Sequence, residues 1–150
     1  MPQSLARVPI HLVYSTKHRQ PWISDEVRAA LHRYQAVVLG NLGCPDVIVN
    51  SVEDHVHALF ELSRTVSIAE AVEEVKKSSS KWIKPQGTEL EGFAWQTGHS
   101  AFAVSPSNVD RVRRYIENQR EHHRKTPFQD EYRALLIRHG VEFDERYVWD

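Results

Sequence analysis

The chain has 150 residues, of which 41% are hydrophobic and 26% charged, and its formal net charge is −1. This composition is that of a globular protein and excludes a disordered chain, while the charge excludes a uniformly basic nucleic-acid binder. No apolar run approaches the roughly 20 residues that cross a bilayer, and the N-terminal residues lack the apolar segment of a secretory signal. We therefore expect one cytoplasmic domain over residues 1–150, without a membrane partner.

The first half of the chain predicts a strand, a helix and a hairpin. Alternating apolar residues predict a strand over residues 10–14, followed by a basic loop. An apolar stripe at helical spacing, with a Ser-Asp cap at its start and a glycine stop, predicts a helix over residues 24–43. Two β-rich segments, 47–52 and 55–62, are separated by two polar residues and predict an antiparallel pair.

The next segments complete a ferredoxin-like order. Ser67 and Glu70 form a capping box, which predicts a second helix that ends near residues 82–85. Residues 93–95 and 101–104 predict strand segments on either side of a glycine-containing turn. The resulting order βαββαβ predicts an α+β fold with a ferredoxin-like antiparallel sheet.

Two further helices are expected after the sheet. Ser105-Pro106 is an N-cap followed by proline, which predicts a third helix from about residue 106 to about residue 124. Thr126-Pro127 repeats this signal before residues 128–139, and Gly140 is a typical helix stop. The last ten residues form an aromatic tail whose path is not predicted.

The first candidate site residues are two histidines on one predicted strand. His55 and His57 are two residues apart, so their side chains point to the same face with Cα atoms about 7 Å apart. At that separation both imidazoles can lean toward one cation. Taken alone, the same spacing is more typical of two surface histidines on a half-exposed strand.

The second candidate is a tyrosine on the predicted third helix. Tyr115 and Gln119 are four residues apart and lie on one flank of that helix, beside a core stripe of Val109, Val112 and Ile116. A phenol is a suitable nucleophile at phosphorus, because a phosphotyrosine ester conserves the energy of the broken phosphodiester. Gln119 could supply an oxygen ligand to a metal. A tyrosine at this spacing is also typical of core or rim packing.

Basic residues gather in the loop after the first strand, on the second helix and along the third helix. Each cluster alone could be a solvated surface, but three of them in a neutral chain predict local positive grooves for phosphates. The candidates for DNA contact are Lys17, Arg19, Lys76, Lys77, Lys81, Arg114 and Arg120.

Four motifs in order carry a family resemblance. They are Asp54-His55-Val56-His57, Trp95-Gln96-x-Gly98, Ala101-Phe102-x-Val104-Ser105 and Tyr115-Ile116-x-x-Gln119-x-x-His122-His123. Together they closely resemble the IS200/IS605-type single-tyrosine transposases of the HUH nuclease superfamily. The resemblance covers nearly the whole chain, and the joint order is much more specific than any single motif.

The resemblance implies a fold, an activity and a set of partners. It implies a ferredoxin-like domain whose C-terminal helices carry the catalytic tyrosine, and a homodimer whose sites can be shared between subunits. It also implies cleavage and rejoining of single-stranded DNA at hairpin-marked ends through a 5′-phosphotyrosine. In this chain Tyr115 matches the nucleophile, and His55, His57 and Gln119 match the metal ligands. Imidazole ligands favour Mn²⁺ or Zn²⁺ on physical grounds, whereas the resemblance implies Mg²⁺ or Mn²⁺.

Two departures and two alternatives accompany this interpretation. His99-Ser100 stands where the family often has an aromatic-glycine pair, and Glu53 stands where a proline is common. These two departures bear on the shape of two turns and not on the metal ligands or the nucleophile. One alternative is a non-catalytic nucleic-acid-binding module, but the stacking aromatics of RNA-recognition sheets are missing from the sequence. The other is a metal-dependent nuclease that uses water as its nucleophile and therefore tolerates Tyr115→Phe.

Overall fold

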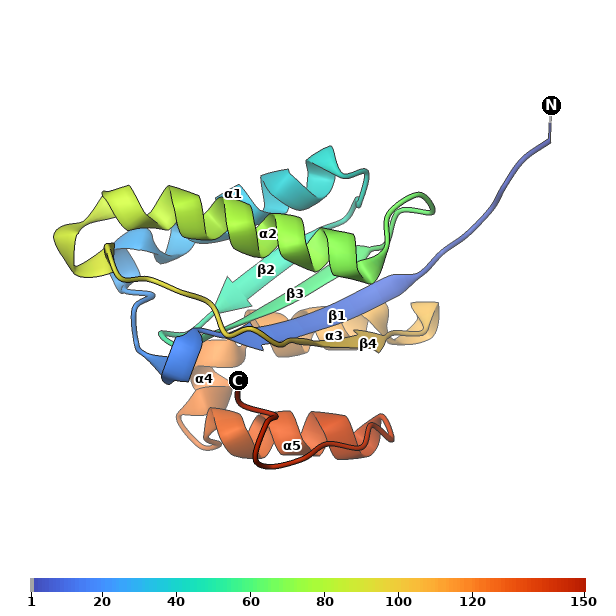
Figure 1. Cartoon of the computed structure of the whole chain (residues 1–150). Helices are drawn as coiled ribbons and strands as arrows, with labels where there is room; N and C mark the ends of the chain where they lie inside the picture. The colour runs from blue at the N-terminus through green and yellow to red at the C-terminus, as the bar shows by residue number, and fades with distance from the viewer. Residues whose placement is uncertain (1) are drawn as a thin grey trace.

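Four strands pair into one antiparallel sheet (Figure 1). The structure is a computed structural model, and it describes residues 2–150. The strands are β1 (Pro9–Ser15), β2 (Ile48–Ser51), β3 (His55–Glu61) and β4 (Ser100–Ala103). Their spatial order is β2-β3-β1-β4, and every neighbouring pair is antiparallel. This order confirms the predicted ferredoxin-like sheet, and it places β1 and β3 at its centre.

Helices cover both faces of the sheet (Figure 1). The helices α1 (Asp25–Asn41) and α2 (Ile68–Ile83) lie on one face, and the Oγ of Ser67 accepts the backbone N–H of Glu70 at 3.1 Å, as the predicted capping box requires. The other face carries α3 (Val109–Glu117), α4 (Gln119–His123) and α5 (Phe128–Arg138). The described residues also include four short 3₁₀ turns: Lys17–Arg19, Lys84–Gln86, Thr88–Leu90 and Pro106–Asn108.

The alternation along β1 and β3 separates an apolar face from a histidine-bearing face. Apolar residues of both strands, among them Leu12 and Val56, enter the main core under α1 and α2. The residues between them face α3, α4 and α5, and they include His11, His55 and His57, all buried. Strand geometry therefore places His55 and His57 on one face, as predicted, and that face lies under the C-terminal helices together with His11.

Two predicted elements differ from the structure. Residues 93–95 form no strand: Trp95 makes one isolated bridge with Thr16, and the last strand starts only at Ser100. The predicted third helix, 106–124, is divided into a 3₁₀ turn, α3 and α4. The division at Asn118 has a physical cause in β2, because the side-chain amide of Asn50 donates to the carbonyl of Ile116 at 2.7 Å. That carbonyl would otherwise accept a helical N–H.

The C-terminal segment closes over the histidine-bearing side. Its residues Phe143, Val148 and Trp149 pack against a second apolar cluster that includes Phe128 and Tyr132 of α5. The carbonyl of Asp150 accepts the backbone N–H of Gly98 at 2.9 Å, which ties the tail to the turn before β4.

Within residues 2–150, no helix combines the length and the apolar character that crossing a membrane requires.

Candidate active site

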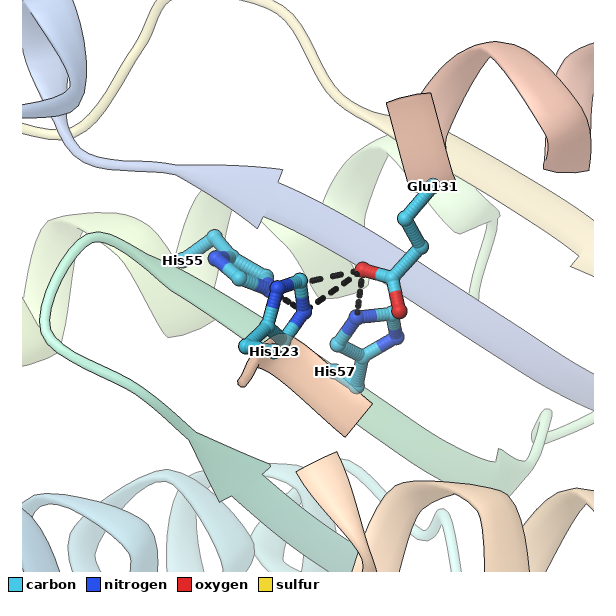
Figure 2. Close-up of side chains that lie close together, drawn as sticks. All are labelled: His55, His57, His123 and Glu131. Carbon is cyan, nitrogen blue, oxygen red and sulfur yellow. Dashed lines mark hydrogen bonds and ion pairs between the residues drawn. The ribbon is translucent and has the colours of Figure 1, made fainter. Parts of the chain in front are cut away.

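A buried carboxylate lies at the centre of the histidine cluster. Glu131, on the first turns of α5, is 3% exposed and points toward the histidines of β3 (Figure 2). Its Oε1 lies 3.0 Å from Nε2 of His57, 3.0 Å from Nε2 of His123 and 3.4 Å from Nε2 of His55. Four side chains from β3, α4 and α5 thus converge on one point under the helices.

The two strand histidines are held from behind by further polar groups. The carboxylate of Asp54 accepts the Nδ1–H of His55 at 2.7 Å, and Nε2 of His11 lies 2.8 Å from Nδ1 of His57. Both partners engage the ring nitrogen that points away from Glu131. Such contacts fix the orientation of metal-binding imidazoles in proteins, because they leave Nε2 directed at the ion.

The predicted ligand Gln119 reaches the same point from α4. Its side chain is fully buried, its Oε1 lies 3.0 Å from Nε2 of His123, and its Nε2 donates to Oε2 of Glu131 at 3.3 Å. The break at Asn118 does not separate Gln119 from Tyr115, since the Gln119 amide still donates to the Tyr115 carbonyl at 3.4 Å. The structure therefore brings together His55, His57 and Gln119.

Tyr115 meets this cluster within the same chain. Its hydroxyl donates to Oε2 of Glu131, and its ring centroid lies 5.7 Å from that of His57. The neighbouring His122 also approaches the carboxylate, with Nε2 3.1 Å from Oε2. One chain thus contains the phenol and the histidine pair side by side.

Burial and hydrogen bonding set the protonation of these groups in opposite directions. Burial would raise the pKa of Glu131, but the hydrogen bonds from His123, His55 and His57 outweigh it and hold that pKa well below its usual value. Burial and the adjacent Glu131 carboxylate raise the pKa of Tyr115, and burial lowers the pKa of His57 to about 4. Glu131 is therefore ionised, the phenol keeps its proton, and His57 is a neutral imidazole at neutral pH.

This donor set fits a divalent cation. Among residues 2–150, His55, His57, His123 and Glu131 form a group that offers one nitrogen or oxygen atom each, all within 4.8 Å of one another. Neutral imidazoles and a carboxylate suit first-row transition metals, and an added amide oxygen from Gln119 would suit Mn²⁺ or Mg²⁺ as well. The residues present are thus compatible with the metal that the resemblance implies.

A cleft opens directly onto Tyr115 and Glu131. Its volume is about 620 Å³, and its walls come from the end of β4, from α3 and from α5. Two arginines, Arg111 of α3 and Arg138 of α5, line it together with His139. The phenol therefore lies beside an open, partly cationic groove.

The predicted DNA contacts occupy several surfaces. Lys17 and Arg19 follow the end of β1, where Ser15 pairs with His55, and are thus close to the site. Arg114 is exposed on α3, and exposed Arg120 on α4 bonds to Asp25 at 2.7 Å.

The three predicted contacts on α2 lie on the far face of the sheet from the histidines (Figure 1). Lys76 donates to the carbonyls of Gln96 and Gly98 at 2.9 and 2.5 Å, and Lys77 pairs with Glu74 at 3.0 Å. Lys81 is exposed. The ammonium group of Lys76, which the sequence predicts to contact DNA, therefore binds the loop before β4.

Sequence reasoning missed the roles of Glu131, His123 and His11 in this arrangement. A signal for Glu131 exists, because Phe128, Glu131 and Leu135 are spaced as one buried face of α5, and a glutamate within such a stripe needs a polar partner. His123 belongs to the last of the four motifs, and His11 lies on the same face of β1 as the buried Val13.

Comparison with known proteins agrees with the motifs. Residues 4–119 match the family described as "Transposase IS200 like". A curated relative, the ISDra2 transposase TnpA of Deinococcus radiodurans, is 22% identical over 116 residues, which is 74% of this chain and 83% of the relative.

Two solved structures are also similar. A crystal structure assigned as a candidate transposase of Deinococcus radiodurans R1 has a TM-score of 0.61 at 23% identity, covering 79% of this chain and 98% of that one. A REP-associated tyrosine transposase bound to a REP hairpin has a TM-score of 0.48 at 13% identity, covering 77% and 67%. The family match covers most of the chain, and both the ordered motifs and the fold agree with it. The chain therefore belongs to the IS200-like transposases.

Proposed function

We propose that this transposase cleaves and rejoins single-stranded DNA at hairpin-marked ends, with Tyr115 as nucleophile and a divalent metal, Mg²⁺ or Mn²⁺, held by His55, His57 and Gln119. The observation that carries the proposal is the position of the Tyr115 hydroxyl, which lies in the same buried cluster as the histidines and at the edge of an open cleft. The cleft would give a DNA phosphate access to this hydroxyl, and a tyrosine that serves only packing does not need such access.

The chemistry assigned to each group follows from its position. The metal would polarise the scissile phosphate and stabilise the leaving 3′ oxygen. Tyr115 Oη gives up its proton and attacks phosphorus, the bond between phosphorus and the 3′ oxygen breaks, and the 3′ oxygen takes up a proton, so no net proton is gained or lost. The products are a 5′-phosphotyrosine and a free 3′ hydroxyl. Attack of a 3′ hydroxyl on that ester reverses the step, joins the strand and returns Tyr115 to its phenol form.

Glu131 controls the phenol before DNA binds. Its carboxylate accepts the proton of Tyr115 in a hydrogen bond, which orients the hydroxyl and keeps it protonated. Entry of a DNA phosphate, itself an anion, brings a second acceptor to this hydroxyl. The hydrogen bond between Tyr115 and Glu131 must break before Tyr115 Oη can reach phosphorus, so the two side chains separate during the reaction.

The cleft supports a route for the strand beside the scissile phosphate. Arg111 and Arg138 are exposed cations on opposite walls, and guanidinium groups bind phosphate oxygens with two parallel hydrogen bonds. Arg114 on α3 and Arg120 on α4 lie on the same side of the sheet as the cleft, and Lys17 and Arg19 follow the end of β1. Any contact by Lys76, Lys77 or Lys81 would have to involve a DNA segment that lies on the opposite face, such as a hairpin stem.

A covalent adduct tests the proposal. We expect the protein, incubated with labelled single-stranded oligonucleotides from palindromic ends near its own gene and with Mn²⁺ or Mg²⁺, to form a protein–DNA species that survives denaturation. The adduct should be lost in Tyr115→Phe and kept in Tyr147→Phe, since Tyr147 is 64% exposed on the tail.

The same assay separates the alternatives. Strand cleavage without an adduct, unchanged in Tyr115→Phe, would indicate a nuclease that uses water. Hairpin binding without any cleavage would indicate a binding module. Sites shared between two subunits, as the resemblance implies, are tested separately by mixing Tyr115→Phe with His57→Ala protein: restored activity requires shared sites, whereas no recovery means that one chain holds all parts of its site.

A further inference from the structure

We propose that Glu131 is a direct ligand of the metal, so that the centre is completed by a carboxylate from α5 together with His123. The inference rests on the proposed metal site of His55, His57 and Gln119 and extends it. The family match ends at residue 119, whereas His123 and Glu131 follow it. The carboxylate would therefore come from a helix outside the matched residues.

The spacing of the donor atoms supports this inference. Four donors at about 2.1 Å from a tetrahedral cation lie about 3.4 Å from one another. The Oε1 of Glu131 lies 3.4 Å from Nε2 of His55 and 3.0 Å from Nε2 of both His57 and His123. The Nε2 atoms of His55 and His123 are 2.9 Å apart. Small outward adjustments would give each of these atoms a place around one ion.

The hydrogen bond behind His55 sets the nitrogen that faces the proposed ion. The carboxylate of Asp54 accepts the Nδ1–H of His55, so Nε2 is the nitrogen directed at His123 Nε2 and at the Glu131 carboxylate. A neutral imidazole that donates from Nδ1 presents a lone pair at Nε2, which is the form that binds a metal. A metal ion would therefore take the place of the protons that the imidazoles share with Glu131.

The surroundings of Glu131 indicate a fixed ligand. Its helix is anchored by Phe128 and Leu135, which are buried in the second apolar cluster, and the ring of Phe128 stacks on His55 with centroids 4.0 Å apart.

The carboxylate also changes the charge of the site. Three neutral imidazoles and one carboxylate leave a divalent ion with a net charge of +1, which still attracts a DNA phosphate, and a hard oxygen donor favours Mn²⁺ over softer ions.

Metal titration of the full chain provides the first test. By calorimetry with Mn²⁺, Glu131→Gln should lose more than about 100-fold in affinity, which exceeds the loss typical of an indirect hydrogen-bond partner. The matched control is Asp130→Asn, the preceding carboxylate of the same helix, which is exposed and paired with Arg133 at 3.3 Å. It should keep the wild-type affinity. A Glu131→Gln affinity within tenfold of wild type would overturn the inference.

A change of ligand atom provides the second test. A thiolate prefers Cd²⁺ to Mn²⁺, so Glu131→Cys should shift the affinity ratio toward Cd²⁺ and show a thiolate-to-cadmium charge-transfer absorption. Asp130→Cys should show neither, and unchanged Cys44, which is buried in every variant, provides the baseline. A Glu131→Cys protein that folds but lacks the absorption would contradict direct ligation.

The two proposals fail in different ways. If wild-type protein binds Mn²⁺ and His57→Ala loses it while Glu131→Gln keeps it, only the role of Glu131 is wrong. If wild-type protein neither binds a divalent metal nor forms the DNA adduct, the proposed function itself is wrong.

Discussion

His11 on β1 contacts His57 on β3 through Nε2 and Nδ1, 2.8 Å apart, with the two rings stacked at a centroid distance of 5.1 Å. The contact joins neighbouring strands on the buried, histidine-bearing side of the sheet. It fixes which nitrogen of His57 points at Glu131, and so it links the first strand to the proposed metal centre.

Replacing His11 should weaken metal binding without removing a ligand. His11→Phe fills a similar volume but loses the hydrogen bond to His57, so we expect Mn²⁺ affinity to fall by about 10-fold to 100-fold. His11→Gln, which can still hydrogen-bond, should lose less. Calorimetry measures the affinity, and circular dichroism checks that the fold is retained. Equal Mn²⁺ affinity in wild type and His11→Phe would show that His11 does not position His57 for metal binding.

Arginines that line the cleft should contribute to binding of single-stranded DNA. We expect Arg138→Ala and Arg111→Ala each to weaken binding and to reduce the dependence of log affinity on log salt by about one unit, as the loss of one phosphate contact does. Arg133→Ala is the control, since Arg133 lies on the same helix but bonds to Glu145 at 2.6 Å. Fluorescence anisotropy at several salt concentrations measures both quantities. A loss in Arg133→Ala as large as in Arg138→Ala would argue against the cleft as the DNA route.

Asn50 should stabilise the break between α3 and α4. Its amide donates to the carbonyls of Ile116 and Glu117 at 2.7 and 3.2 Å. Asn50→Ala leaves these carbonyls without that partner, and we expect the free energy of unfolding to fall by about 1 kcal/mol. Asn41→Ala, at the exposed end of α1, should change it much less. Urea denaturation measures both, and a stability unchanged in Asn50→Ala would contradict the assigned cause of the break.

The stability of the protein should fall in mildly acidic solution through His32. Burial, with a smaller contribution from Arg28, lowers the pKa of His32 from 6.5 to about 4. Between these pH values the unfolded chain binds a proton that the folded chain does not, so the free energy of unfolding decreases as pH falls from 6.5 to 4. Allowing for the partial exposure of the ring, the contribution is about 2 kcal/mol.

A variant isolates this histidine from the others. His32→Asn has no group that titrates at this position, so its loss of stability between pH 6.5 and 4 should be smaller than that of wild type. Urea denaturation at several pH values gives the difference. Parallel curves for the two proteins would show that His32 does not contribute to the acid sensitivity.

The sequence predicts those parts of the site that depend on local periodicity. Strand alternation is enough to place His55 and His57 on one face, and helix spacing is enough to place Tyr115 near Gln119. The parts that escape prediction depend on contacts between distant segments. Asn50 breaks the third helix from a strand that precedes it by more than sixty residues, and Glu131 reaches the histidines only because α5 packs beneath the sheet.

The register of β3 determines whether its two histidines face the proposed metal centre. Val52 donates its N–H to the carbonyl of His55 at 3.3 Å, which closes the turn and fixes the pairing of the two strands. A slip of one residue would exchange His55 and His57 for Val56 and Ala58, because neighbouring side chains point to opposite faces. Two imidazoles would then enter the apolar core, and Tyr115 would face methyl groups. A shift of one residue in the register of β3 would thus separate the two halves of the site without changing the identity of any residue in it.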